Sequence, residues 1–166
     1  MVLKLIVACC KGGGIGFKGA LPWSLKHDLR HFKKITTQKE NSAIIMGNTT
    51  WLSLSKRPLP NRTNLVLTSS VPTDSSPAHF FSSKKEVHEH CLAKKYDDIW
   101  IIGGEKVYRQ YIDSVDMVYM TKIHKNYNCD TFFPMTNLFL NFTIHDKTLV
   151  LNENNIPFQY FTYRRK

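Results

Sequence analysis

The stretch Ile99-Trp100-Ile101-Ile102-Gly103-Gly104-Glu105-Lys106-Val107-Tyr108 joins a short apolar run to a helical pattern through two glycines. β-Branched and aromatic residues fill its first four positions, which predicts a buried strand over Ile99–Ile102. The glycines end that strand, and Val107 and Tyr111 then fall on one face of a helix predicted over Glu105–Ile112. A strand that leads through a glycine turn into a helix is the unit from which parallel α/β sheets are built.

The same alternation extends along the chain in both directions. Further strands are predicted at Val2–Cys10, Ala43–Met46, Asn64–Thr68, Ala78–Phe81 and Val115–Thr121. Further helices are predicted at Ser24–Thr36, at Thr49–Leu54 and at Lys84–Lys95, the last with Val87, Cys91 and Leu92 on one face. Near the C-terminus, Phe142–Val150 and Phe158–Arg165 alternate like half-exposed antiparallel strands. The pattern predicts an α/β fold with helices on both faces of a mostly parallel sheet and an antiparallel C-terminal edge.

Ligands of such sheets bind outside the carboxyl ends of the strands. The loops predicted at that edge are Lys11–Trp23, Gly47–Thr50, Thr68–Ser70, Gly103–Lys106 and Thr121–Ile123. Two further connections, Lys56–Arg62 with its prolines and the polar loop Ser69–Pro77, are read as turns.

Composition limits the class of protein. The chain has 166 residues, of which 42% are apolar, and this favours a single domain over residues 1–166. Every apolar run is interrupted before it reaches the length of a membrane span, and the N-terminus does not have the pattern of a signal peptide. We therefore expect a cytoplasmic protein without membrane partners.

The four cysteines are Cys9, Cys10, Cys91 and Cys129. None of them forms a Cys-x-x-Cys pair, and no histidine pair has zinc-finger spacing, so no metal site is predicted. Cys9 and Cys10 adjoin in a predicted strand and point to opposite faces. We expect the cysteines to behave as small hydrophobic residues in a reducing compartment.

The formal net charge is +10, which favours anionic partners. One interpretation is a basic nucleic-acid-binding module. That interpretation predicts clustered lysine and arginine with exposed aromatic residues, whereas the basic residues here are scattered in short groups. We therefore do not expect nucleic acid as the main ligand.

Asp28 is the most informative residue for function. Pro22 cannot lie inside a helix, so a helix starts after it, with Ser24 as the predicted N-cap. One face of that helix is apolar, with residues at Leu25, Leu29, Phe32 and Ile35. Asp28 borders this face, where an unpaired carboxylate is costly. It is either an acidic residue favoured by the helix dipole or a carboxylate held in a cleft for a cationic or hydrogen-bond-donating ligand.

Glycine motifs suggest anion sites. Gly14–Gly19 fits G-x-G-x-x-G, but Pro22 prevents a helix from opening at its third glycine, so a mobile loop over a neighbouring site is favoured. Gly103-Gly104 begins a helix whose first N–H groups can face a phosphate, and Gly47–Thr50 repeats the arrangement. Ordinary glycine turns and threonine caps are the alternatives at these two positions. Arg62 follows a proline turn and is either a fork for a carboxylate or a surface charge.

Taken together, six motifs resemble dihydrofolate reductase in order and at nearly the same spacing, from residue 2 to the C-terminus. They are Ile15-Gly16…Leu21-Pro22-Trp23, Asp28-Leu29…Phe32, Ile45-Met46-Gly47…Thr50-Trp51, Arg57-Pro58-Leu59-Pro60…Arg62, Ile101-Ile102-Gly103-Gly104…Val107-Tyr108 and Asp130-Thr131…Phe133-Pro134. The resemblance implies a three-layer fold with a central, mostly parallel eight-stranded sheet, an antiparallel C-terminal edge strand and about four flanking helices. It also implies reduction of 7,8-dihydrofolate to tetrahydrofolate, with hydride transfer from NADPH to pterin C6 and protonation at N5. Such a reaction supports one-carbon metabolism and thymidylate synthesis.

The resemblance also assigns roles to residues. Asp28 would bind the 2-amino group and N3 of the pterin with Thr121 bonded behind it, and Arg62 would hold the glutamate carboxylate. The remaining substrate contacts would come from Ile6, Val7, Leu29, Phe32, Leu54 and Ile102. Leu21 would close over the nicotinamide, and Trp23 would order a water near Asp28, which makes Asp28, Leu21, Trp23 and Thr121 the predicted catalytic set. The predicted cofactor contacts are Ala8, Ile15, Gly16, Gly47, Asn48, Thr49, Thr50, Leu67, Thr68, Ser69, Gly103, Gly104, Glu105, Lys106, Val107 and Tyr108.

Two positions depart from the family pattern. In the family, a basic residue that meets the 2′-phosphate of NADPH is common directly after Gly47, and another is often found near Ser70. Here the first position is Asn48, and the basic residue near Ser70 is absent. The 2′-phosphate would then rely on hydroxyl groups and on Lys84 or Lys85, which would reduce the preference for NADPH over NADH. The resemblance further implies a monomer that binds antifolate inhibitors and, in the family, a cis Gly103–Gly104 peptide. A same-fold reductase of a ribosylated pyrimidine is the close alternative, and it would not need Asp28 together with Arg62.

Overall fold

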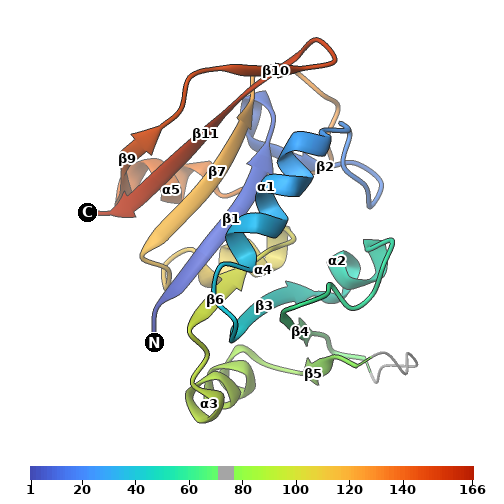
Figure 1. Ribbon diagram of the computed structural model, residues 1–166, viewed down its shortest axis with the longest axis vertical. Helices are drawn as coiled ribbons and strands as arrows, with labels where there is room; N and C mark the ends of the chain where they lie inside the picture. Colours follow the sequence, from blue (N-terminus) through green and yellow to red (C-terminus); the bar gives the residue numbers. More distant parts are fainter. Residues whose placement is uncertain (71–76) are drawn as a thin grey trace.

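The chain folds around one large twisted sheet (Figure 1). The computed structural model describes residues 1–70 and 77–166, so most of the predicted loop Ser69–Pro77 lies outside the described residues. The strands are β1 Leu3–Cys9, β2 Gly14–Gly16, β3 Ser42–Gly47, β4 Thr63–Leu67, β5 His79–Phe81, β6 Asp98–Ile101, β7 Met117–Ile123, β8 Thr131–Phe132, β9 Phe142–Lys147, β10 Leu151–Glu153 and β11 Ile156–Arg165. The α-helices are α1 Lys26–Thr36, α2 Asn48–Ser53, α3 Lys84–Lys94, α4 Glu105–Tyr111 and α5 Met135–Asn141.

The sheet confirms the predicted fold class. Along its width the order is β10-β11-β7-β1-β6-β3-β4-β5, with β9 also paired to β11. The strands from β7 to β5 in this order are all parallel to their neighbours. The C-terminal strand β11 runs antiparallel to β7, and β9 and β10 pair with its outer edge. The small pair β2 and β8 forms a separate two-stranded sheet.

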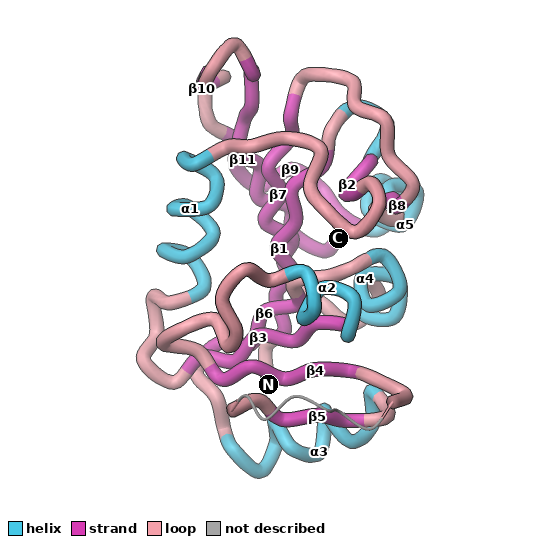
Figure 2. Tube along the Cα trace, turned by 90° about the vertical axis from the view of Figure 1, so that its right-hand side faces the viewer, coloured by secondary structure: helices cyan, strands magenta, loops and turns pink. Residues whose placement is uncertain are grey.

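Alternation along the central strands divides the core between the two faces of the sheet. On β1, Leu5 belongs to a cluster with residues of α3, α4 and α5, whereas Ile6 packs with residues of α1 and α2. Figure 2 shows the strands between α1 on one side and α4 and α5 on the other. Successive side chains of a strand point to opposite faces. A sheet that is covered on both faces therefore needs strands that are mostly apolar at both alternating positions, as β1 and β3 are.

Four local predictions were wrong or incomplete. Ser24 does not cap α1, because the N-cap position is Leu25 and a carboxylate from β10 takes the first N–H groups of the helix. Leu92 is 53% exposed, because α3 turns only Val87 and Cys91 towards the sheet. The predicted strand Phe142–Val150 ends at Lys147, and a separate strand begins at Leu151. The elements β2, β8 and α5 were not predicted; β2 and β8 have only three and two residues, which is too short to show a periodic pattern.

Among the described residues, no helix is both long enough and apolar enough to cross a bilayer.

Candidate active site

A cleft of about 1550 Å³ lies at the carboxyl ends of the parallel strands. Its floor contains Ala8 of β1, Gly47 of β3, Leu67 of β4, Ile102 after β6 and Thr121 of β7. Parallel strands bring their carboxyl ends to one edge of the sheet, so residues far apart in sequence meet there. The cleft is therefore where the predicted loops were expected to place a ligand.

Nearly all predicted site residues line this cleft. The predicted residues among its lining are Ile6, Val7, Ala8, Ile15, Gly16, Leu21, Asp28, Leu29, Phe32, Gly47, Asn48, Thr49, Thr50, Leu54, Arg62, Leu67, Thr68, Ser69, Ile102, Gly104, Glu105, Lys106, Val107, Tyr108 and Thr121. Gly103 and Trp23 are not among the lining residues; Trp23 is buried, with its ring 5.5 Å from that of Tyr127. No described residue accepts a hydrogen bond from the buried indole N–H of Trp23.

Sequence reasoning missed a second group of lining residues. It consists of Gly19, Ala20, Lys33, Ser53, Ser55, Lys56, Leu59, Pro60, Ser82, Ser83, Gln110, Asp130 and Thr131. Most of them lie in connections between helices and strands, where periodicity carries no signal. Asp130 and Thr131 lay within a quoted motif, so their position in the chain was the available clue.

Asp28 is half-buried and its carboxylate is bonded from behind. Its Oδ1 accepts a hydrogen bond of 2.7 Å from the hydroxyl of Thr121, as predicted. Burial raises the pKa of Asp28 above its ordinary value, while the Thr121 hydroxyl and nearby His27 act in the opposite direction. The bond occupies one carboxylate oxygen, and no described residue donates a hydrogen bond to Oδ2.

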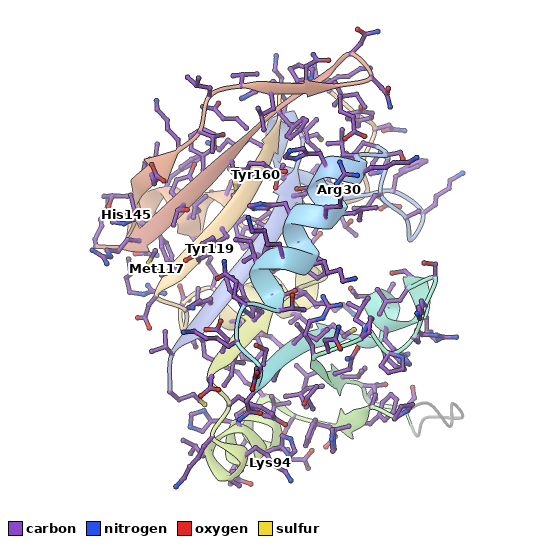
Figure 3. The ribbon with its side chains drawn as sticks, viewed as in Figure 1. Arg30, Lys94, Met117, Tyr119, His145 and Tyr160 are labelled. Atoms are coloured by element: carbon purple, nitrogen blue, oxygen red, sulfur yellow. The ribbon has the colours of Figure 1, made fainter. Side chains whose placement is uncertain are left out.

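The helix that carries Asp28 is attached to the C-terminal hairpin. Glu153 of β10 accepts hydrogen bonds of 2.8 Å from the backbone N–H groups of Lys26 and His27. Tyr160 of β11 lies on the sheet face that α1 covers (Figure 3), and its hydroxyl is 2.8 Å from Nδ1 of His27. The first turn of α1 is therefore fixed by residues more than a hundred positions away.

Apolar side chains form a slot beside the carboxylate. Ile6 is buried in the wall, and Phe32 and Leu54 pack against the same core cluster. Leu21 and Leu29 line the cleft although they are 52% and 57% exposed. Exposed leucines at the rim of a cleft are suited to covering flat apolar rings.

Arg62 is held at one end of the slot. Its Nε donates to the carbonyl of Pro60 and its Nη1 donates to the hydroxyl of the buried Thr36, both at 2.9 Å. The guanidinium carbon lies 5.7 Å from the centre of the Phe32 ring. Burial lowers the pKa of Arg62, but an arginine stays charged near neutral pH. Its Nη2 is thus directed by two fixed bonds, which suits recognition of a carboxylate.

Two glycine turns meet at the opposite end. The N–H of Gly47 donates to the carbonyl of Gly103 at 2.9 Å, and the Gly103–Gly104 peptide is cis, as in the family. Gly103 has a φ of +110°, and a Cβ there would lie 3.0 Å from the Tyr108 ring. A Cβ on Gly47 would lie 3.1 Å from Val107. Only glycine leaves the backbone of both turns open to a ligand, so the geometry fits the pyrophosphate of a dinucleotide.

The wall between these turns and α3 is rich in hydroxyl groups. Ser69, Ser70, Ser82 and Ser83 line it together with Asn48. Lys84 also lines the cleft, but its ammonium donates to the carbonyl of Gln110 at 2.9 Å and to Ser114 at 2.8 Å. The lysine is therefore already directed towards the C-terminal end of α4.

Comparison with known proteins decides the family. The family described as dihydrofolate reductase matches residues 2–165 of the chain. The chain belongs to the dihydrofolate reductase family.

Individual dihydrofolate reductases agree with this assignment. The chain is 34% identical over 179 residues to the dihydrofolate reductase of Aedes albopictus, covering 98% of this chain and 96% of that protein. It is 36% identical over 151 residues to the viral dihydrofolate reductase of Saimiriine herpesvirus 2, covering 83% of this chain and 71% of that one. The solved structure of the Enterococcus faecalis dihydrofolate reductase, complexed with NADP(H) and RAB-propyl, superimposes with a TM-score of 0.86 at 32% identity, covering 99% and 96% of the two chains.

The activity follows from the family. The chain is an NADPH-dependent oxidoreductase that reduces 7,8-dihydrofolate to 5,6,7,8-tetrahydrofolate. This result sets aside the two alternatives, a reductase of a ribosylated pyrimidine and a nucleic-acid-binding module. The cleft has an apolar slot with one carboxylate at its base and two open glycine turns beyond it, which fits a flat substrate ring next to a dinucleotide.

Proposed function

We propose that Asp28 and Thr121 bind the pterin ring of dihydrofolate and that residues 1–166 act as one catalytic domain. The observation that carries the proposal is the 2.7 Å bond from Thr121 to Oδ1 of Asp28. It fixes the orientation of the carboxylate, so that its two oxygens can accept hydrogen bonds from the 2-amino group and N3 of the pterin. A carboxylate is suited to two N–H donors because it is an acceptor at both oxygens.

The rest of the substrate extends along the slot. Phe32 and Leu54 contact its rings, and Arg62 binds the carboxylate of the glutamate tail. The fixed guanidinium supports this role, because its two bonds to Pro60 and Thr36 leave Nη2 free to form a charge-assisted pair. The backbone at Val7 and Ile102 flanks the pterin at the ends of β1 and β6.

The cofactor occupies the other half of the cleft. NADPH supplies a hydride for pterin C6 when it is bound. Ala8, Ile15 and Gly16 surround the nicotinamide, and the turns at Gly47 and Gly103 hold the diphosphate. The protein contributes mainly position and exclusion of water, since holding two rings at reacting distance removes much of the entropic barrier. Leu21 closes over the rings, and Trp23 assists proton delivery by ordering a water near Asp28.

Binding of the adenosine end is expected to be less selective than the family pattern implies. Asn48, Ser69 and Ser70 offer neutral hydrogen bonds to a 2′-phosphate, and the Lys84 ammonium is already bonded elsewhere. NADPH is the cofactor, and NADH is a usable substitute at a higher KM. We also propose that the enzyme is a cytoplasmic monomer that binds antifolates and has neither membrane nor nucleic acid as a partner.

The test of the proposed site is the variant Asp28→Asn. Loss of a charge-assisted hydrogen bond costs about 1.5–3 kcal/mol, which corresponds to roughly a 10- to 100-fold loss of kcat/KM for dihydrofolate. The assay follows NADPH absorbance on addition of dihydrofolate near neutral pH. Asp146→Asn, an exposed carboxylate on β9, is the matched control and should keep wild-type kinetics. Near wild-type kinetics in Asp28→Asn would refute the role.

A further inference from the structure

The helix α1 has no cap from its own segment. Its N-cap residue is Leu25, which has no side-chain acceptor, so the first N–H groups of the helix need partners from elsewhere. The Glu153 carboxylate supplies them, with Oε2 accepting from Lys26 N–H and Oε1 from His27 N–H, each at 2.8 Å. One oxygen for each N–H fixes both the distance and the orientation of the carboxylate.

Glu153 is presented by a tight hairpin. It ends β10 and pairs with Ile156 of β11. Between them Asn154 and Asn155 both have positive φ, 51° and 63°, as a two-residue type I′ turn requires. The N–H of Asn155 also donates to the side chain of Asn152 at 3.1 Å. The carboxylate therefore comes from a conformationally restricted turn.

The same hairpin attaches to α1 and to Asp28 at further points. Tyr160 of β11 stacks on His31 of α1 with ring centres 3.8 Å apart, and its hydroxyl meets His27. Burial lowers the pKa of His31 to about 4, so that ring is neutral near neutral pH. Tyr160 also pairs in the sheet with Thr121, the residue that bonds Asp28. Asp28 thus lies between His27 and His31 on α1, and both of these residues contact Tyr160 of β11.

We propose that Glu153 is a positioning residue for dihydrofolate reduction, because it fixes the first turn of α1 and thereby holds Asp28 against Thr121. The inference rests on the proposed role of Asp28 in substrate binding. It goes beyond that role by assigning a function to a residue outside the cleft.

The charge of Glu153 gives the role a second readout. The bonds from the His27 and Lys26 N–H groups lower the pKa of Glu153, so it stays ionised near neutral pH. Its negative charge raises the pKa of Asp28, a smaller effect than burial of Asp28. The other titratable groups that interact with Asp28 are His27 on α1, Tyr108 on α4 and Tyr160 on β11. A Glu153 variant keeps all three side chains, although the Glu153 charge also raises the pKa of Tyr160.

The experiment compares Glu153→Gln with wild type. Glutamine keeps the shape, but its amide N–H₂ faces one of the two helix N–H groups. We expect kcat/KM for dihydrofolate to fall about 3- to 30-fold, because a small misplacement of a binding group has effects of this order. The KM for NADPH should not change, since α1 contributes nothing to that half of the cleft. The midpoint of the pH profile that reports Asp28 should move to higher pH, because the Thr121 bond affects the pKa of Asp28 more strongly than the Glu153 charge does. Glu153→Asp keeps the charge but not both helix bonds, so its midpoint should also move to higher pH.

Two controls separate the outcomes. Glu89→Gln on α3 removes an exposed carboxylate whose ion-pair partner is Lys85, and it should behave like wild type. Wild-type KM for dihydrofolate and an unshifted midpoint in folded Glu153→Gln would overturn the inference. If Glu153→Gln does not fold, a wild-type KM in Glu153→Asp would overturn it, because the shorter side chain cannot reach both N–H groups. If Asp28→Asn loses activity and the Glu153 variants do not, this inference alone is refuted. If Asp28→Asn keeps wild-type activity, the proposed site is refuted.

Discussion

Replacing Thr121 by valine removes one hydrogen bond and changes little else. Thr121 is 4% exposed on β7, and valine has nearly its shape. The hydroxyl donates to Oδ1 of Asp28 at 2.7 Å, a short distance typical of a bond to a charged acceptor. The variant therefore isolates the contribution of this bond to the ionised form of Asp28.

The size of the effect follows from that bond. A hydrogen bond to a charged group contributes about 1.5–3 kcal/mol, and 1.36 kcal/mol corresponds to one pKa unit, so the pKa of Asp28 should rise by roughly one to two units. The direction is upward because the hydroxyl lowers the pKa of Asp28, and its loss leaves the larger, opposite effect of burial less opposed. Because the bond favours the ionised form, Thr121→Val should lose more stability near neutral pH than in acid.

The assay is an NMR titration of the Asp28 side-chain carbonyl carbon, assigned by its absence from Asp28→Asn. Thr143→Val on β9 is the control, since Thr143 is exposed and should leave the titration unchanged. Thermal unfolding of both variants at acid and neutral pH tests the stability effect. A pKa of Asp28 that stays the same or falls in Thr121→Val would show that the hydroxyl does not stabilise the ionised carboxylate.

Three further variants test other parts of the site. Because burial raises the pKa of Asp28, its ionised form lowers the stability of the fold above that pKa, and Asp28→Asn should raise Tm near neutral pH by about 2–4 °C for each kcal/mol gained. The gain should vanish in acid, where the wild-type carboxyl is also neutral. Calorimetry that finds no gain near neutral pH would count against a buried charge. Asn48→Lys adds a cation at the hydroxyl-rich wall and should increase the preference for NADPH over NADH by about 5- to 10-fold; an unchanged ratio of the two KM values would place the 2′-phosphate elsewhere. Gly103→Ala places a Cβ 3.0 Å from the Tyr108 ring at a φ of +110°, and urea unfolding should show a loss of about 1–3 kcal/mol; full stability would contradict this packing.

Local signals in the sequence were sufficient for the fold class. The apolar run at Ile99–Ile102 and the glycines after it determine the backbone conformation of their immediate neighbours. The structure accordingly places β6 and α4 within one residue of the predicted bounds. The pairing of Thr121 with Asp28 has no local signal of this kind; the family resemblance implied it, and the structure contains the bond.

Interactions between distant segments could not be predicted in this way. Ser24 has a good capping side chain, and position alone favoured it, yet Glu153 takes the N–H groups because the β10–β11 hairpin brings it there. The bond from Gly47 to Gly103 has no local signature either. These contacts depend on tertiary structure, and they determine the shape of the site.

The place of β1 in the sheet has a consequence for how the chain is made. It precedes both of its neighbours by many residues: these are β6, where Leu3 pairs with Ile99, and β7, where Cys9 pairs with Lys122. Such long-range pairing closes large loops and slows folding. A ribosome-bound chain must therefore keep the apolar β1 unpaired until β6, which ends at Ile101, has emerged, and one edge of β1 stays open until β7 has emerged as far as Ile123. During that interval β1 is a natural substrate for chaperones, and Asp28 has no Thr121 to bind.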